Sequence, residues 1–356
     1  MVAILRDTTY SQSLWGQKLY QSLVERLRQK RIPFCDVTDT CPADCDGVFV
    51  IATHSEWTRQ VIRQLNAAGR RPILLCNQTE LIGGCVYSAV CSDINTSMKN
   101  VLDTLKAQKK TRVALYGVNF RSLSDISRVN TLFAWREDAF DAMEIFENEG
   151  SLSLCFDAFY PHITAFDAVI CANDFAALSL VKRLEAQDPA ALQNITVISC
   201  AQTHIAAAYR RYITTLHMHF ELYGKAAVYI YESLGKRPYL TGMTVNVAWD
   251  LGDGTAEQKV TETALSLPTE EDVFYNDPEL NGMMIAEKIL GTADDTDRAI
   301  LKNLLQGKSY GETAEACFLA ESSVKYRLKG LVAQSGAADK RELLDALKAY
   351  GWETLL

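Results

Sequence analysis

The sequence has no run of about 18 apolar residues, the length that a helix needs to cross a bilayer. Its first ten residues, MVAILRDTTY, also lack the basic stretch followed by an apolar stretch that marks a secretory signal. We therefore expect a cytoplasmic protein that makes no contact with a membrane.

Short catalytic motifs are missing as well. The sequence has no G-x-S-x-G at a strand-to-helix turn, no G-x-x-x-x-G-K-[ST], no G-x-G-x-x-G after a predicted strand and no H-E-x-x-H. A phospho-receiver domain needs an acidic pair after its first strand and an Asp ending its third. Here only Asp7 follows the first apolar segment, and His54 follows GVFVIAT. We therefore expect neither an enzyme nor a receiver domain.

Metal-binding spacing is not found among the ten cysteines. The tightest cluster, Cys35, Cys41 and Cys45, lacks the C-x-x-C pairing of zinc sites. Three other cysteines lie inside apolar segments, where a free thiol acts as a small buried hydrophobe: Cys76, Cys171 and Cys200. We expect no metal and no cofactor.

Excess positive charge is also absent. The net charge is -8, yet the segment from Asp294 to the end holds nine basic and ten acidic residues and is nearly neutral. Most of the acidic excess therefore lies upstream. Because nucleic-acid affinity depends on Lys and Arg near phosphates, any DNA binding must come from locally placed cations.

Alternating segments dominate the first 250 residues. Short apolar, β-branched runs such as GVFVIAT, PILLCN and ITVISC are separated by amphipathic stretches such as SLWGQKLYQSLVERLRQK. This alternation is typical of βαβ units around parallel sheets. We predict an α/β domain over 1–251 and a connector over 252–293 with one short helix around Leu280 to Leu290.

The remaining segment, 294–356, is predicted to be all-α. Ile300, Leu301, Leu304 and Leu305 line one side of a helix from Thr296 to Gln306, and Gly307 suits a left-handed cap. Capping boxes are predicted to begin two further helices, at Ser309 to Glu312 and at Asp339 to Glu342. Four helices fit between Asp294 and Gly351.

One of these helices carries the features of a DNA reader. In AESSVKYRLKGLVAQ, Val324, Leu328 and Leu331 form a buried stripe. The opposite face is polar and positive, and a helix of about 14 residues is long enough to lie in a major groove. The residues that we expect to contact DNA are Ser322, Ser323, Lys325, Tyr326 and Lys329.

The segment LLQGKSYGETAEACFLAESSVKYRLKGLVAQSGAADKRELLDAL resembles the LuxR-type helix-turn-helix of bacterial regulators. The resemblance implies that Lys325 and its face contact double-stranded DNA and that the last helix helps to form a homodimer. Ala320 departs from the family, which favours a Ser cap there, and Arg327 replaces the common His. The matching positions are Gly307, Glu312, Ala314, Ser323, Val324, Lys325, Leu331, Arg341, Glu342 and Leu343.

The first 250 residues resemble the effector-binding core of the lactose-repressor family, which has the type I periplasmic-binding-protein fold of two Rossmann-like lobes. The ordered matches include DGVFV, RVALYGV, FDAVICANDFAALSL and ITVISCAQTHIAAAYRRYITTLHMHFELYGKAAVYIYESL. The resemblance implies one lobe of roughly 1–117 plus 220–243 and another of 118–215 plus 244–251. It also implies a small-molecule effector, a sugar or related metabolite.

Single positions that match the family's ligand contacts are expected to bind this effector: Tyr10, Trp15, Arg128, Asn173, Gln202 and Phe220. Each has a structural alternative. Tyr10 and Trp15 could pack within a lobe, Arg128 could form an ion pair on a helix surface, and Asn173 could cap the following helix. Ala201-Gln202 replaces the family's acidic pair, so the effector need not be a sugar.

Together these features predict a one-component transcription regulator whose DNA affinity depends on a small molecule. The alternative is that the α/β domain binds no ligand and serves as a dimerisation or partner-binding module of a DNA-binding regulator.

Overall fold

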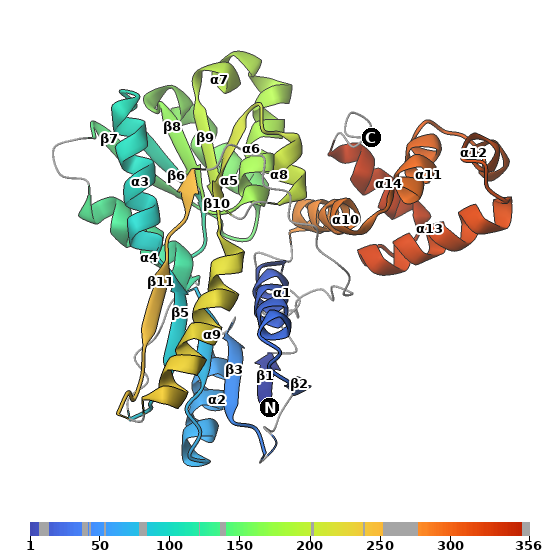
Figure 1. Ribbon diagram of the computed structural model, residues 1–356. Helices are drawn as coiled ribbons and strands as arrows, with labels where there is room; N and C mark the ends of the chain where they lie inside the picture. Colours follow the sequence, from blue (N-terminus) through green and yellow to red (C-terminus); the bar gives the residue numbers. More distant parts are fainter. Residues whose placement is uncertain are drawn as a thin grey trace. The chain divides into compact units, whose positions relative to one another are not determined.

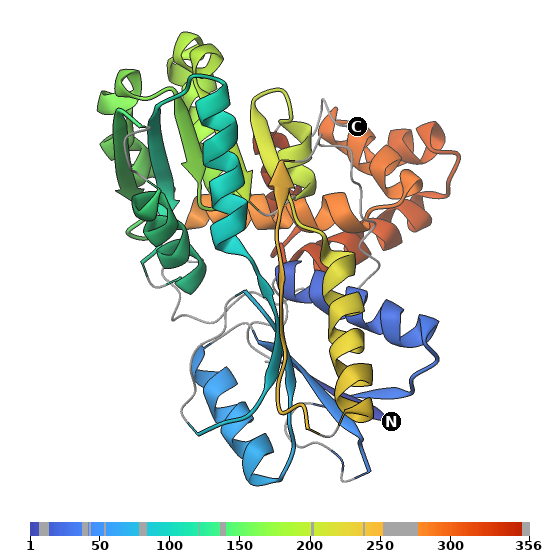
Figure 2. The ribbon, with the colours of Figure 1, turned by 60° about the vertical axis from the view of Figure 1, so that its left-hand side comes forward.

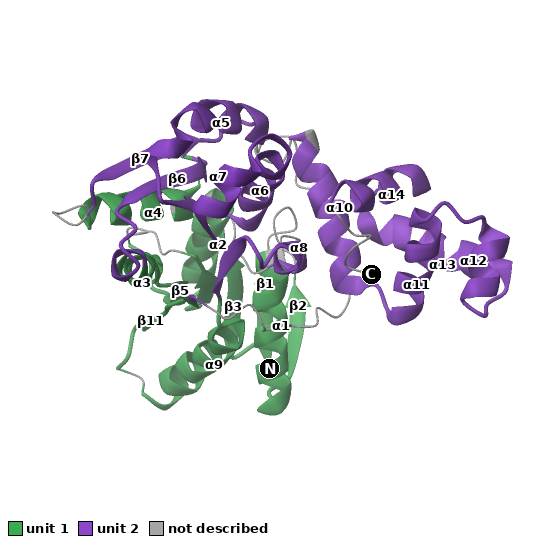
Figure 3. Cartoon of the chain, turned by 90° about the horizontal axis from the view of Figure 1, so that it is seen from above, with its two compact units in different colours: residues 1–104, 120–136, 218–250 green, residues 105–119, 137–217, 251–356 purple. Residues whose placement is uncertain are grey.

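The computed structural model describes most of the chain in two compact units (Figure 3). Unit 1 comprises Met1–Thr104, Phe120–Arg136 and Met218–Asp250, and unit 2 comprises Leu105–Asn119, Glu137–His217 and Leu251–Leu356. The described residues are 1–6, 14–37, 42, 44–52, 55–77, 84–120, 122–135, 140–200, 203–237, 239–251 and 277–350.

Unit 1 is built on a six-stranded sheet with the order β11-β5-β4-β3-β1-β2, whose neighbouring strands pair in parallel. Its central strands are almost wholly buried, as apolar strands covered on both faces should be. The strands are β1 (Val2–Arg6), β2 (Phe34–Val37), β3 (Gly47–Ala52), β4 (Ile73–Cys76), β5 (Ser88–Ser92) and β11 (Thr244–Val247).

Helices cover both faces of this sheet. The helices α1 (Leu14–Gln29) and α9 (Phe220–Lys236) lie side by side on one face, and α2 (Ser55–Ala67) covers the other (Figure 2). On the first face the rings of Phe49 and Tyr231 are 6.0 Å apart. On the second, Val48 and Val50 belong to the same buried cluster as Ile62 of α2. Alternate residues of one strand thus supply two hydrophobic layers.

Two further helices complete the description of this region. They are α3 (Ile94–Ala107), which follows β5, and α4 (Leu123–Ala134), which begins at the side-chain cap of Ser122.

Unit 2 contains the second six-stranded sheet, with the order β12-β10-β9-β8-β6-β7. Its strands are β6 (Arg112–Val118), β7 (Ala142–Glu147), β8 (Ala168–Cys171), β9 (Thr196–Cys200), β10 (Ile213–His217) and β12 (Asp250–Leu251). A cluster rich in aromatic rings, including Tyr116, Phe156 and Phe159, joins one face of the sheet to its helices. These are α5 (Leu152–Phe159), the 3-10 helix Tyr160–Ala165, α6 (Asp174–Gln187), α7 (Pro189–Asn194) and α8 (His204–Ala208).

The C-terminal part of unit 2 is all-α, as the sequence predicts. Its helices are α10 (Pro278–Thr292), α11 (Asp295–Leu305), α12 (Tyr310–Ala316), α13 (Glu321–Ser335) and α14 (Lys340–Ala349) (Figure 1). Ser309 and Glu312 form the predicted capping box, Asp339 caps α14, and Gly307 has the left-handed φ of 84°. The predicted connector helix is α10.

The strand pairing differs from the lobe boundaries expected from the sequence. We expected 1–117 in the first lobe and 244–251 in the second, but β6 lies in the second sheet and β11 in the first. The reason is pairing at sheet edges: β11 aligns Val245 with Val90 of β5, and β6 lies between β7 and β8. Apolar pattern alone gives no information on which sheet a strand joins.

The expected cysteine environment is confirmed at Cys76, Cys171 and Cys200, which are buried. Within the described ranges, no helix has the length and apolar character required to cross a membrane. In the same ranges, His, Cys, Asp and Glu side chains form no group of three that could hold a metal ion.

Candidate functional site

The helices α12 and α13 carry the polar residues for which the sequence predicts contact with DNA. Helix α12 begins at the capping box of Ser309, and a short turn leads from Cys317 to Ala320 before α13 begins. Phe318 in this turn has a φ of 56° and a side chain that is 96% exposed. Because an L-residue rarely adopts that backbone conformation, the turn is tightly constrained by its flanking helices.

Helix α13 is seated by the predicted stripe. Val324, Leu328 and Leu331 are all buried in the cluster shared with α10, α11 and α14. The opposite face points to solvent, and its exposed members are the five predicted DNA contacts: Ser322, Ser323, Lys325, Tyr326 and Lys329. Burial of one face thus fixes which side chains the helix presents.

Lys325 lies in a more structured environment than its sequence suggests. Its Nζ forms an ion pair of 2.6 Å with Oε1 of Glu321, one turn earlier, and the hydrogen bond that Lys325 donates to Glu321 raises the pKa of Lys325. The same Nζ is 5.4 Å from the ring centroid of Tyr310, and Nζ of Lys340 is 4.3 Å from it. Cations from two helices therefore converge on one aromatic ring of a third.

No local pattern in the sequence indicates this convergence. Tyr310 and Lys340 each stand at the first position of a predicted helix, directly after a capping residue. That placement brings them to the ends of α12 and α14, but only the packing of the three helices shows that both ends meet α13. We define the cationic face as Ser322, Ser323, Lys325, Tyr326, Lys329 and Lys340.

Arg327 holds α13 in place from its other side. Its Nη1 donates to Asp294 at 2.8 Å and to Asp297 at 2.9 Å, the two residues of the capping box of α11. These hydrogen bonds raise the pKa of Arg327. The Arg that departs from the family's usual residue therefore joins the start of α11 to the middle of α13.

The start of α13 has no side-chain cap. Ala320 occupies the cap position, and its side chain cannot accept a hydrogen bond from the first amides of the helix. The turn before the cationic face is thus less stabilised than the start of α12.

The predicted effector residues fall in different parts of the chain. Tyr10 and Gln202 lie outside the described residues. Trp15 is half-buried in the first turn of α1, and its indole Nε1 has no acceptor among the described residues. Phe220 is buried in unit 1, where Nζ of Lys18 lies 5.2 Å from its ring centroid. Trp15 therefore has a buried indole N–H without an acceptor in the described part of the chain, and Phe220 packs within unit 1.

Arg128 forms an ion pair, as its structural alternative proposed, but the pair is buried and does not lie on a helix surface. It bonds Asp125 one turn away on α4, and both side chains are buried. Its guanidinium carbon also lies 5.9 Å from the ring centroid of Trp249. Within unit 1 this arginine is thus held by a carboxylate and an aromatic ring, and its Nε has no partner there among the described residues.

The Asn173-Asp174 pair at the end of β8 has two separate tasks. Asn173 caps α6 by accepting from the Ala176 amide at 3.0 Å, as its structural alternative proposed. Asp174 is fully buried, and its Oδ2 accepts from the Thr203 amide at 2.6 Å and from the Thr203 hydroxyl at 2.9 Å. Burial raises the pKa of Asp174, and hydrogen bonds from Ser199 and Thr203 oppose that shift.

No protein-family model matches the sequence, and no curated protein is similar to it. Solved structures are similar in fold. The Lac repressor bound to ONPG has a TM-score of 0.56 at 14% identity over 72% of this chain and 82% of its own. A LacI family transcriptional regulator from Weissella paramesenteroides with bound sucrose has a TM-score of 0.53 at 15% identity over 71% of this chain and 96% of its own.

A third similar structure is an ABC transporter solute-binding protein from Bacillus halodurans with bound myo-inositol. Its TM-score is 0.52 at 15% identity, over 70% of this chain and 92% of its own. The α/β part of the chain has a type I periplasmic-binding-protein fold. This similarity supports the expected fold of two parallel-sheet lobes, and it concerns architecture, since the sequence identities are low.

Proposed function

We propose that this protein is a transcription regulator that binds DNA through α12 and α13 as a LuxR-type helix-turn-helix and responds to a small molecule in its periplasmic-binding-protein-like part. The observation that carries the proposal is the cationic face. Five of its six residues are exposed on α13, whose opposite face is buried. In this function Lys325 and Lys329 meet phosphates or guanine edges, and Ser322, Ser323 and Tyr326 meet phosphates or base edges.

The ion pair between Lys325 and Glu321 opposes the binding of DNA by Lys325. The Glu321 carboxylate also lies where it would repel a phosphate at Lys325, so contact with DNA favours separation of the pair. Lys340 and Lys329 remain near the same surface to attract the phosphate backbone. The near-neutral C-terminal segment thus binds DNA through a local concentration of cations rather than through net charge.

Ligand binding is supported by the fold. Solved structures of similar fold hold sucrose or myo-inositol, and we propose that a sugar or related metabolite is the effector here. A ligand shifts the regulator between states only through its different affinity for each of them. The proposed assembly is a homodimer, which presents two copies of α13 to paired half-sites.

The DNA proposal is tested by anisotropy with labelled duplexes of random sequence, followed by selection of the retained sequences. Lys325→Ala is expected to weaken binding to every duplex and to reduce the slope of log affinity against log salt by about one. The charge-matched control is Lys236→Ala on α9 in unit 1, which should leave binding unchanged. Equal affinity of Lys325→Ala and the unaltered protein would contradict the assignment.

The effector proposal is tested by thermal unfolding of the full chain with sucrose, myo-inositol and a wider panel of sugars, nucleosides and amino acids. A compound that binds only the native state raises the melting temperature, by an amount that grows with its concentration over its dissociation constant. If no compound in these classes raises it, the α/β part is not a sensor for them.

A further inference from the structure

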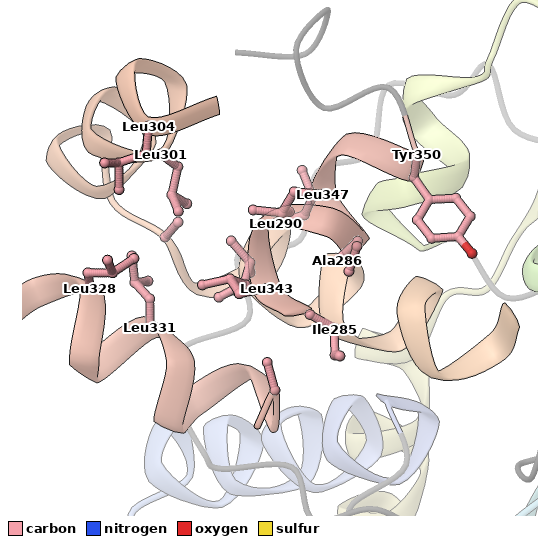
Figure 4. Packing of buried hydrophobic residues seen from close by; sticks show 14 of the residues in the cluster. Ile285, Ala286, Leu290, Leu301, Leu304, Leu328, Leu331, Leu343, Leu347 and Tyr350 are labelled. Carbon is pink, nitrogen blue, oxygen red and sulfur yellow. The ribbon is translucent and has the colours of Figure 1, made fainter. Parts of the chain in front are cut away.

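Helix α10 is buried on two sides. Met283, Ile285 and Ile289 belong to one hydrophobic cluster that also contains Leu178 of α6 and Ile205 of α8. The same cluster continues into the C-terminal helices, where Leu301, Leu328 and Leu343 converge on α10 (Figure 4). The helix therefore contacts α6 and α8 on one side and α13 and α14 on the other. Close packing of this kind transmits displacements.

The start of α10 is fixed to the second sheet's helices. Oδ2 of Asp277 accepts from the Leu152 amide of α5 at 2.7 Å, while its Oδ1 caps α10 itself through the Glu279 amide at 2.9 Å. Arg183 of α6 donates to Oε2 of Glu279 at 2.7 Å. The first turn of α10 is thus attached to two helices of the α/β part.

Near its end, α10 holds the start of α8. Glu287 is buried, and its Oε1 and Oε2 accept from the amides of His204 at 3.0 Å and Ile205 at 2.8 Å. Asp174 accepts from the preceding amide, that of Thr203, so two carboxylates from α6 and α10 satisfy three successive amides. Helix α8 has only five residues and depends on these partners for its position.

The next residue, Lys288, lies near the C-terminal end of α13. It is buried, and a β-carbon placed on Gly336 would lie 3.1 Å from its Nζ. Gly336 is the left-handed cap of α13, with a φ of 80°, and a cation beside a helix C-terminus is favourable. Two adjacent buried charges on α10 therefore contact α8 and the end of α13.

We propose that α10 couples the α/β part to the DNA-reading helix, with Glu287 as the positioning residue that converts a displacement of α8 into a displacement of α13. The proposal rests on the proposed function. Helix α8 lies just after the carboxyl end of β9, the edge at which open α/β sheets bind ligands. A shift there pulls on Glu287, and the shared core and Lys288 carry the shift to α13.

Peptide-resolved hydrogen exchange of the full chain, without DNA or effector, tests the coupling. Glu287→Gln should speed exchange by at least about fivefold at residues 203–206 and also in α13, since both depend on the position of α10. The matched control is Asp188→Asn, which likewise converts a capping carboxylate into an amide, here one bonded to the Ala191 amide of α7 and the Tyr160 hydroxyl, and should leave both 203–206 and α13 unchanged. Faster exchange at 203–206 with an unchanged α13 would show a purely local cap and overturn the proposal.

A second variant approaches from the other side and covers the case in which Glu287→Gln does not fold. Lys288→Met keeps the apolar stem and removes the charge beside Gly336. The coupling predicts faster exchange at 203–206 as well as in α13, and an unchanged α8 would overturn it. Because these readings need no DNA, failure of the protein to bind any duplex would refute the proposed function while leaving the coupling decided by exchange.

Discussion

The hydrophobic clusters beside the two sheets differ in how far they extend along the chain. The hydrophobic cluster between the first sheet and α2 contains only residues of unit 1. On the second sheet, Leu178 of α6 and Ile205 of α8 instead belong to a cluster that continues through α10 into α11, α13 and α14. The cluster beside the first sheet is therefore confined to unit 1, whereas the helices of the second sheet and the C-terminal helices share a core. A shared core makes the stability of one part depend on the other.

The largest test of this difference is Ile289→Ala in α10. Ile289 has no exposed surface, and its truncation should cost about 2 to 5 kcal/mol in the free energy of unfolding of unit 2. The control is Ile62→Ala in α2, equally buried in unit 1. Segment-resolved exchange in urea should show both the second lobe and α11–α14 destabilised by the first variant and neither by the second. Destabilisation of α11–α14 alone would mean that the core is not shared in energetic terms.

Arg327→Met tests the contact that holds α13 against α11. Two partly exposed ion pairs are lost, so we expect the C-terminal helices to lose about 1 to 2 kcal/mol after screening by solvent. Denaturant titration followed by exchange in α11 and α13 measures the loss. Lys348→Met, on the exposed surface of α14, serves as the control and should change little.

The same ion pairs predict a pH dependence. Burial acts to raise the pKa of Asp294, but its hydrogen bonds from Arg327 and the Asp297 amide lower it below 3.8 overall. A lowered folded-state pKa adds stability above the unfolded value, and that stability is lost as the pH falls through the folded value. The C-terminal helices should therefore weaken below about pH 4, and less so in Arg327→Met. An identical acid profile in both proteins would contradict this.

The two caps on either side of the turn provide a smaller comparison. Ala320→Ser should stabilise the C-terminal helices by about 1 kcal/mol, because a hydroxyl can accept from a free amide at the start of α13. Ser309→Ala should destabilise them by a similar amount, because it breaks the capping box of α12. Melting temperatures of the two variants should therefore move in opposite directions from that of the unaltered protein.

Glu321→Gln should have the smallest effect, on DNA affinity. Removal of the carboxylate releases Lys325 for phosphate, and we expect about two- to threefold tighter binding at low salt that fades as salt is added. The double variant with Lys325→Ala is the control, since Glu321→Gln should then change affinity much less. A gain of equal size in the absence of Lys325 would assign the effect to overall charge.

Local patterns predicted from the sequence were the reliable ones. The stripe of Val324, Leu328 and Leu331, the capping box at Ser309 and the left-handed Gly307 each depend on residues within a few positions of one another. The α/β class follows from alternation for the same reason. These features follow from the local sequence pattern and do not depend on which distant residues pack against them.

Contacts between distant residues could not be predicted. Glu287 reads as an ordinary surface residue in a connector helix, and nothing near it in the sequence indicates that it meets the amides of α8 more than 80 positions earlier. Arg327 and Asp294 are 33 residues apart, and Trp249, whose ring lies beside the guanidinium of Arg128, comes more than 100 positions after it. Placement of β6 and β11 failed for this reason too. Binding of DNA by α13 and binding of an effector by the α/β part stay predictions.

The late position of β11 has a consequence for synthesis on the ribosome. The other five strands of the first sheet lie within the first 92 residues, but the strand that covers the edge of β5 begins at Thr244. At translation rates of about 5 to 20 residues per second, the intervening roughly 150 residues take on the order of 10 to 30 s to appear. During that time the nascent chain presents an unpaired, apolar strand edge, the kind of surface that recruits chaperones or other nascent chains.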